Sequence, residues 1–211
     1  MLNSLGNSIE NVLEFSLPMV ILSVIIAVSL RIADIIKNKR KIVLYKEVLA
    51  LFFMIYILCL FQVVTFQDTT SVTGNNLIPF KEIFRYSLGS RLFIKNVLGN
   101  VVMFIPYGFF CSYILKENRY LPILVLTLIA SVSIETTQLM IGRVFDIDDI
   151  MLNTVGGMIG FYIYILFLKA REFYKPLLSK EWMLNIIAIL LLIGFIKICL
   201  LYTSDAADDR I

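Results

Sequence analysis

The sequence contains no histidine among its 211 residues. This absence removes the commonest proton shuttle, the Ser-His and Cys-His nucleophile systems, and the commonest ligand of transition metals. Any acid–base chemistry must therefore rely on carboxylates, lysine or tyrosine. Cysteine is also scarce: Cys59 and Cys111 lie inside apolar runs without metal-ligand spacing, so we expect both to pack as small hydrophobic side chains.

Charged residues make up only 17% of the chain, whereas hydrophobic residues make up 59%. The mean hydropathy of +0.87 excludes an ordinary soluble globular composition. Several apolar runs reach the roughly 20 residues that a helix needs to cross the hydrocarbon layer. We therefore predict an all-α fold, a polytopic transmembrane helical bundle of about five or six spans, at residues 17–36, 48–66, 97–115, 121–141, 150–168 and 182–198.

The two ends of the chain differ from the rest. The N-terminus lacks the basic region and small-residue cleavage site of a secretory signal peptide, so we expect the first apolar run to remain as a span. The last thirteen residues, CLLYTSDAADDRI, break the preceding composition, and from Cys199 to Asp209 they look like the translation of a sequencing-library adapter. We expect residues 199–211 to be a sequence-assembly scar and exclude them from the fold.

Basic residues in the loops predict orientation, because loops rich in lysine and arginine stay in the cytoplasm. The loops within 37–46, 116–119 and 169–180 together carry 11 Lys and Arg residues, against 5 in segment 67–96 and at position 143. The N-terminus is therefore predicted to be extracytoplasmic. The stretch ETTQLMIGRVFDIDD, residues 135–149, is predicted to face the same side.

Segment 67–96 is not an ordinary connector, since NNLIPF and KEIFRYSLGSRLFIK mix bulky apolar residues with positive charges. Such a segment can lie along the membrane interface with its basic groups among anionic headgroups. A short helix packed on the bundle is the alternative, and the sequence leaves both open. In either case we expect the segment to cover the outer ends of the helices.

A polar stripe follows the fifth predicted span. Asp146, Asp149, Asn153, Gly156 and Gly160 are spaced by three, four, three and four residues, which places them on one helix face. Such a face must meet other helices and not lipid. We expect the G-x-x-x-G pair, Gly156 and Gly160, to pack against a neighbouring helix and not to catalyse.

Acidic residues gather at the start of that helix and on the helix before it. Helix capping explains one or two of the aspartates Asp146, Asp148 and Asp149. Three aspartates within four residues are more than a cap requires. Glu135 lies about six residues inside its span, at a depth of roughly 9 Å by helical rise. An ionisable residue at that depth indicates a functional site, with Gln138 on its face and Arg143 as the nearest partner in sequence.

The third predicted span adds an amide pair and a helix breaker. Asn96 and Asn100 share one helix face, and Asn100 either belongs to a polar site or joins helices through a hydrogen bond. Pro106, followed by Gly108, is expected to kink the span and to release a carbonyl that needs another partner. We assign Pro106 and Gly108, with the two stripe glycines, to helix packing.

Three stretches, NVLGNVVMFIPYGFF, ETTQ and GRVFDIDDIMLNTVGGMIGF, resemble in this order the VanZ-like family, named for a membrane protein associated with teicoplanin resistance. The resemblance runs from about residue 76 to about residue 161 and implies a bacterial envelope protein located in the cell membrane. The member that gives the family its name lowers susceptibility to lipid-tailed glycopeptides without rebuilding the peptidoglycan precursor. The resemblance therefore implies a similar effect on teicoplanin-type glycopeptides as an expectation for this chain. The matching positions are Asn100, Pro106, Gly108, Glu135, Gln138, Arg143, Asp146, Asp149, Asn153 and Gly156.

This resemblance divides the chain into four parts. Residues 1–75 would supply two N-terminal spans with a basic cytoplasmic loop, and residues 76–168 the VanZ-like core. Residues 169–198 would supply a cytoplasmic loop and the final span, before the scar at 199–211. Expected partners are membrane lipids and a lipid-linked or amphiphilic envelope molecule, not nucleic acid, and no cofactor or metal is expected.

The leading hypothesis is a polar pocket at the outer ends of the third, fourth and fifth spans that engages such an amphiphile. Arg143 would hold an anionic group bidentately, while carboxylates orient it or accept donors from the ligand. The predicted ligand-binding residues, which we call the polar cluster, are Asn100, Glu135, Gln138, Arg143, Asp146, Asp149 and Asn153.

Two other function classes stay open. An intramembrane enzyme acting on a lipid-linked substrate would use Glu135 or Asp149 as catalytic carboxylates, with Asp146 and Asp149 holding Mg²⁺ or activating water. No nucleophile in a recognised setting accompanies them. A proton-coupled transporter would use the buried acid as a relay, although we find no inverted repeat.

Overall fold

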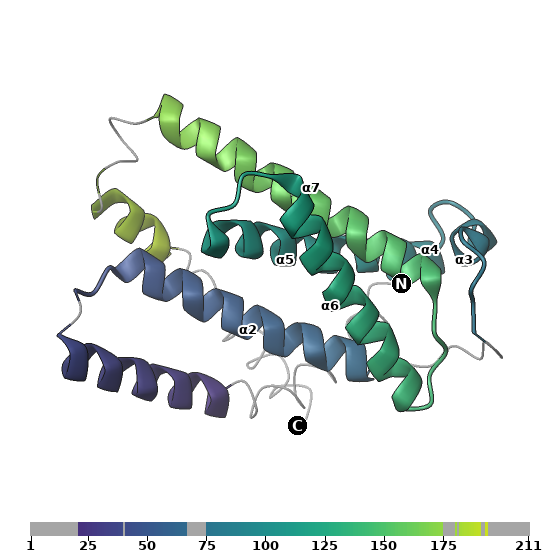
Figure 1. The fold of residues 1–211 in the computed structure, drawn as a ribbon, viewed down its shortest axis with the longest axis horizontal. Helices are drawn as coiled ribbons and strands as arrows, with labels where there is room; N and C mark the ends of the chain where they lie inside the picture. Colours follow the sequence, from purple (N-terminus) through teal and green to yellow (C-terminus); the bar gives the residue numbers. More distant parts are fainter. Residues whose placement is uncertain are drawn as a thin grey trace, which may run out of the picture. The chain divides into compact units, whose positions relative to one another are not determined.

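The computed structural model describes residues 21–39, 41–66, 75–174, 180, 182–190 and 193. Helices form nearly all of the regular structure in these ranges, as the apolar runs predict (Figure 1). Residues 21–38 and 182–190 are helical as well. The labelled elements are α2 (Leu44–Phe66), α3 (Lys81–Arg85), α4 (Arg91–Phe93), the π-helix η1 (Ile94–Leu98), α5 (Gly99–Leu115), α6 (Tyr120–Met140) and α7 (Ile147–Phe173).

Four helical stretches of the described chain are long and apolar enough to cross a membrane: Leu44–Phe61, Arg91–Leu115, Tyr120–Met140 and Ile147–Phe173. The protein is therefore an all-α membrane bundle, and the predicted fold class is confirmed. The first and sixth predicted spans fall only partly on described residues. The end of the sixth span and the predicted scar at 199–211 lie outside them.

The chain divides into two compact units. One unit comprises residues 17–55 and 170–211; in its described part Arg31 bonds both Glu47, at 2.7 Å, and Asp34, at 2.9 Å. In the same unit the Tyr45 N–H donates to Asn185 Oδ1 at 3.0 Å. The other unit comprises residues 1–16 and 56–169, and its described part contains residues 76–168, the predicted VanZ-like core, with all of the polar cluster.

In the second of these units, α5 runs directly on from the π-helix η1, so the span begins with one loosened turn before the regular helix. Pro106 lies inside α5, and the Tyr56 hydroxyl donates to the Met103 carbonyl at 2.7 Å, three residues before the proline. A side chain of α2 therefore contacts the backbone in the turn that the proline weakens.

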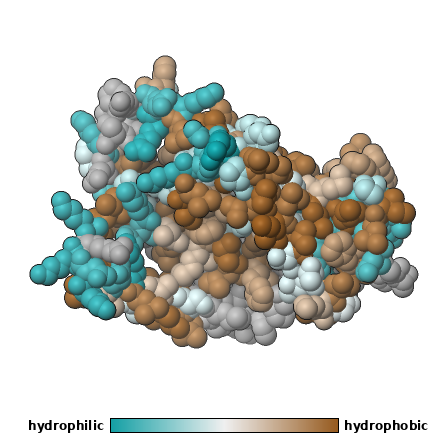
Figure 2. Space-filling model, in the orientation of Figure 1, coloured by the Kyte–Doolittle hydropathy of each residue, from teal (hydrophilic) through white to brown (hydrophobic). Residues whose placement is uncertain are grey.

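Many of the buried side chains of α5, α6 and α7 are small or polar, beside a few large ones such as Phe104 and Phe161, whereas most of the large apolar side chains of these helices are at least partly exposed. The buried positions of α7 include Asn153, Gly156, Gly157 and Gly160, while Val155, Tyr162 and Leu166 are exposed. Figure 2 shows hydrophobic residues over much of the visible surface. This inversion of the soluble pattern is expected where lipid, and not water, surrounds the helices.

Candidate functional site

The start of α7 is capped by its own preceding residue. Asp146 Oδ1 accepts a hydrogen bond from the backbone N–H of Asp148 at 2.9 Å, the second N–H of the helix. The same oxygen accepts from Asn76 Nδ2 at 2.7 Å. Main-chain bonds on either side of Asp146 join Asn76 to Phe145, at 2.8 Å, and to Ile147, at 3.0 Å. Burial raises the pKa of the Asp146 carboxyl, and its hydrogen bonds act in the opposite direction.

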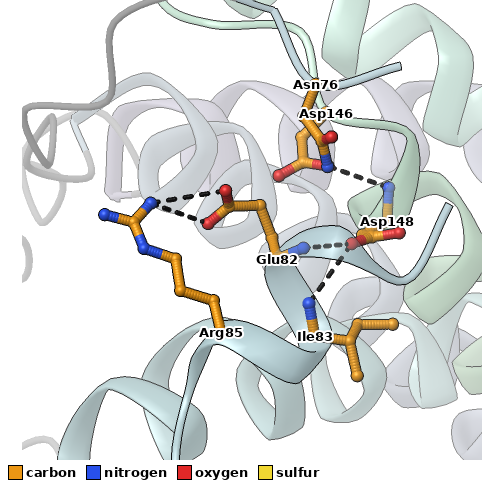
Figure 3. A network of polar contacts seen from close by, with 6 residues as sticks. All are labelled: Asn76, Glu82, Ile83, Arg85, Asp146 and Asp148. Carbon is orange, nitrogen blue, oxygen red and sulfur yellow. Dashed lines mark hydrogen bonds and ion pairs between the residues drawn. The ribbon is translucent and has the colours of Figure 1, made fainter. Parts of the chain in front are cut away.

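Asp148 caps a different helix. Its side chain is only 1% exposed, and its carboxylate accepts backbone N–H groups from Phe80 at 2.5 Å, Glu82 at 2.7 Å and Ile83 at 3.2 Å. The last two are the N–H groups that an N-cap side chain normally satisfies at the start of a helix. Phe80 occupies the N-cap position of α3 and supplies no such bond itself. Asp148 therefore holds α3 onto the start of α7 (Figure 3).

Glu82 stands next to this cap and is also buried. Its carboxylate accepts hydrogen bonds from Arg85 Nη1, at 3.0 and 3.3 Å, while the arginine itself is largely exposed. Figure 3 shows the guanidinium on the far side of Glu82 from Asp148. The pair therefore gives a buried acid a partner at the edge of the site, where a lone carboxylate would be costly.

The turn between α6 and α7 folds Arg143 back onto α6. Gly142 has φ 84°, and its N–H donates to the Leu139 carbonyl at 3.1 Å. The Arg143 N–H donates to the Gln138 carbonyl at 2.9 Å. These two bonds form a Schellman motif, whose left-handed residue is most easily glycine. The chain therefore reverses within a few residues and brings Arg143 beside the last turn of α6.

Glu135 is an almost fully buried acid, with 1% of the residue exposed. Its Oε2 accepts the backbone N–H of Asp146 at 2.9 Å. The Gln138 amide has one orientation that satisfies both neighbours: its Nε2 donates to Glu135 Oε1 at 2.9 Å and its Oε1 accepts from Arg143 Nη1 at 3.0 Å. The structure thus joins Glu135 to Arg143 through a neutral amide.

A second polar group lies further along α7. Asn100 of α5 donates from Nδ2 to Asp149 Oδ1. One turn later Asn153, 3% exposed, donates from Nδ2 to Ser131 Oγ of α6 at 2.9 Å. Among the described residues, Asn153 Oδ1 has no hydrogen-bond partner although it is buried. Polar contacts therefore join α7 to α5 and to α6, and leave one buried acceptor unused.

Glycines set how closely these helices approach. A Cβ atom added to Gly156 would lie 2.1 Å from the Val101 carbonyl oxygen, and one added to Gly160 would lie 2.0 Å from that of Ile105. A Cβ on Gly108 of α5 would lie 1.9 Å from the Gly157 carbonyl oxygen. These distances are too short for any side chain, so the glycines let the α5 and α7 backbones touch. The contact begins two turns after Asp149.

The structure brings the seven predicted ligand-binding residues into two neighbouring groups. Glu135, Gln138, Arg143 and Asp146 are linked around the α6–α7 turn, and the pairs Asn100–Asp149 and Asn153–Ser131 follow along α7. In the described part of the chain, no group of three or more His, Cys, Asp or Glu side chains is arranged to hold a metal ion. Asp146 and Asp149 thus do not form a ready-made Mg²⁺ site with a third acidic ligand.

The sequence did not predict Asn76 and Ser131 as members of this site, nor the role of Asp148 as the cap of α3. Asp148 bonds backbone groups more than sixty residues away, and such partners leave no signal in side-chain spacing. Ser131 did have a signal, because it lies four residues before Glu135 and therefore shares its helix face. Gly142, directly before Arg143, was a signal for the turn.

Comparisons with known proteins match the part of the chain that contains this site. The VanZ/LLP1 family model matches residues 48–168, more than half of the chain. Protein VanZ of Enterococcus faecium is 33% identical over 91 residues, which cover 42% of this chain and 51% of that protein. The chain therefore spans about half the length of this curated relative. No solved structure matches the chain. Because the family model matches more than half of the chain, a range that contains all seven residues of the polar cluster, the chain belongs to the VanZ/LLP1 family.

Proposed function

We propose that this membrane protein engages a lipid-linked or amphiphilic molecule of the bacterial cell envelope at the polar cluster. The observation that carries the proposal is the unused acceptor on Asn153, buried within an apolar helix that is long enough to span a membrane. An unsatisfied acceptor in hydrocarbon is costly, so a position that retains one has capacity for a donor from outside the chain.

The arrangement suggests which groups of the ligand would be recognised. Asp149 and Asn153 lie four residues apart on one face of α7, so hydroxyl, amine or amide N–H groups of a ligand could bond both. Arg143, held beside Gln138, would contact an anionic group at the end of the helices. A headgroup that carries both donors and a negative charge fits this order of side chains.

The location of the site is part of the proposal. Counting basic loop residues puts the N-terminus and the α6–α7 turn on the extracytoplasmic side of the cell membrane. An envelope amphiphile would then reach the polar cluster from the outer leaflet. Family membership and the association of the VanZ-like family with teicoplanin resistance support a test with a lipid-tailed glycopeptide.

The test compares teicoplanin and vancomycin inhibitory concentrations in a susceptible Gram-positive host that expresses the full chain. Asp149→Asn and Asn153→Leu remove acceptors of the polar cluster, and Glu117→Gln in the α5–α6 loop is the matched control. Membrane abundance of each variant is measured alongside. We expect selective protection against teicoplanin by the chain and by the control, and its loss in both cluster variants.

Two results would contradict the proposal. Equal protection by the cluster variants, at equal abundance, would make these residues purely structural. If the intact chain gave no protection, the proposed effect on teicoplanin susceptibility would be wrong. Photo-crosslinking at position 153 with a lipid-linked precursor would then test whether the polar cluster binds an envelope amphiphile. A crosslink to the precursor would keep the wider proposal, and its absence would end it.

A further inference from the structure

Residues 77–93, which we call the α3 segment, expose large apolar side chains. Phe84 is 82% exposed and Leu88 is 87% exposed, more than most apolar residues of the spans. Four more apolar residues of the segment are exposed to a lesser degree: Leu77, Ile78, Phe80 and Leu92. In Figure 2 hydrophobic and hydrophilic residues lie side by side over the α3 end of the molecule. Exposure of this extent needs a partner surface.

The α3 segment is fixed to the bundle. Asp148 bonds three of its backbone N–H groups, and the main-chain pairing of Asn76 with Phe145 and Ile147 holds the chain just before it. Glu82 turns inward and is buried, whereas Phe84, two residues later, turns outward. The apolar exposure is therefore a property of an anchored element and not of a loose loop.

The position of the segment places it at the end of a span. The apolar stretch Arg91–Leu115 begins three residues after Leu88, a distance of at most about 10 Å along an extended chain. Ser90 caps the first turn of that stretch by accepting the Phe93 N–H at 3.1 Å. Since the headgroup layer is only about 5–8 Å thick on each side of the hydrocarbon core, the segment has little room to leave it.

The charges of the segment suit an anionic surface. Lys81, Arg85 and Arg91 are exposed, and Lys95 follows in η1. From residue 77 to residue 95 the single acid is Glu82, which is paired with Arg85. An apolar element flanked by basic residues binds a bilayer surface in two ways: its apolar side chains insert into the membrane, and its basic side chains lie among the phosphate headgroups.

We propose that the α3 segment is an interfacial anchor. Phe84 and Leu88 insert at the boundary between headgroups and acyl chains of the membrane that holds the bundle, and Lys81, Arg85 and Arg91 contact its anionic headgroups. The occupant of this surface is the lipid bilayer itself. Because Asp148 holds the start of α3 at the start of α7, this anchor sets the position of the lipid surface relative to the polar cluster, independently of any ligand bound there.

The experiment measures the depth of a nitroxide label on the full chain in lipid nanodiscs. Cys59, Cys111 and Cys199 are replaced by alanine, and a single cysteine is introduced by Phe84→Cys or, as a water-facing control, by Asn118→Cys in the α5–α6 loop. Nanodiscs contain phosphatidylcholine alone or with phosphatidylglycerol. Accessibility to oxygen, which concentrates in lipid, is compared with accessibility to a water-soluble nickel complex.

We expect the label at position 84 to be more accessible to oxygen than to nickel, and the label at position 118 to show the reverse. Adding phosphatidylglycerol should shift position 84 further toward lipid, and this shift should disappear in the Lys81→Gln, Arg91→Gln double variant, which keeps the pair of Arg85 with Glu82 intact. A monodisperse elution profile and an unchanged helical circular dichroism spectrum establish that each labelled protein is folded.

Two outcomes would overturn the proposal. High nickel accessibility at position 84 in both lipid mixtures would place the segment in water. Protection of the label from oxygen and nickel alike would mean that protein, such as a second copy of this chain, covers the surface. The measurement uses no antibiotic and no envelope ligand, so its failure leaves the proposed function untouched, and the reverse also holds.

Discussion

Asp148 and Asp149 are neighbours in the sequence, yet the structure uses their carboxylates in opposite ways. Asp148 accepts three backbone N–H groups and holds α3 in place. Asp149 lies on the polar stripe of α7, where Asn100 donates to it and where Asn153, one turn later, carries an unused acceptor. The first region satisfies its polar groups within the chain, and the second keeps capacity for more donors.

The difference shows that acidic residues packed together in a membrane protein need not share one role. The burial of Asp146 and Asp148 is explained by capping: Asp146 caps α7 and Asp148 caps α3. Capping does not explain Asp149 and Asn153, because in the part of the chain that the structure describes neither side chain accepts a backbone N–H group at the start of a helix. Burial of a carboxylate is therefore less informative about function than how fully its oxygens are hydrogen-bonded.

The largest effect should come from Asp148→Ala. Three backbone N–H groups would lose their acceptor in a mostly buried place, which we expect to lower the free energy of unfolding by about 2–4 kcal/mol. The measurement is the midpoint of thermal unfolding in detergent, followed by size-exclusion chromatography. Asp149→Ala is the matched control, since one side-chain donor is involved there. A smaller loss for Asp148→Ala than for Asp149→Ala would reverse the comparison.

A packing substitution should come next. Gly156→Ala would force a Cβ atom to 2.1 Å from the Val101 carbonyl oxygen, so α7 must move away from α5 at a cost of about 1–3 kcal/mol. That movement should also separate Asp149 from Asn100. Gly99→Ala is the control, because its Cβ would meet nothing closer than 3.7 Å. Equal melting temperatures for the two variants would show that the helices are not in backbone contact.

A smaller contrast tests the unused acceptor. Asn153→Leu removes one hydrogen bond but also a buried unpaired oxygen, so stability should change by no more than about 1 kcal/mol. Ser131→Ala instead leaves the Asn153 amide without its acceptor and should cost more than Asn153→Leu. Thermal unfolding of both variants decides the order. If Asn153→Leu were the more damaging change, the acceptor would already have a partner in the unliganded protein.

The smallest effect concerns pH at the α7 cap. Burial raises the pKa of the Asp146 carboxyl above its unfolded value, so the folded protein holds this proton more tightly. The contribution of this group to stability is then greatest at acidic pH and is lost as pH rises through the folded pKa, by roughly 1 kcal/mol or less. Unfolding midpoints from pH 4 to pH 7 should fall less steeply in Asp146→Asn than in the natural sequence.

The opposite effect of the variant on the pH dependence of the unfolding midpoint would contradict this prediction. A steeper fall in Asp146→Asn would mean that the carboxyl is stabilised as an anion, with the bonds from Asn76 and Asp148 outweighing burial. The nearby acids Glu82 and Asp148 are unchanged in the variant, so the difference between the two curves isolates this one group. Asn118→Asp, which adds a carboxyl in the exposed α5–α6 loop, controls for a general change in charge.

Hydropathy located the membrane helices well and their ends less well. The predicted span at 150–168 corresponds to α7, which runs from Ile147 to Phe173. The helix begins earlier because Asp146 caps it, and it continues through Lys169 and Arg171 because charged residues end the apolar run without ending a helix. Apolar content reports the thickness of the hydrocarbon core, whereas helix ends depend on caps.

For the candidate site, spacing predicted which residues share a face but not what each one bonds. The three-and-four pattern brought Asp149, Asn153 and Gly156 together on α7, and the structure places all three on its inward side. Asp146 precedes the helix and acts as its cap. The role of Asp148 could not be predicted, because its partners are main-chain groups that every sequence possesses.

The distance along the chain between Asp148 and α3 has a consequence for biosynthesis. The N–H groups of α3 are made 65 to 68 residues before the carboxylate that satisfies them. At about 5–20 residues per second, translation leaves these groups without that acceptor for several seconds, while α5 and α6 are being made. The α3 segment therefore cannot take up its final capped position until α7 has been made, so its docking is a late step in the assembly of this unit.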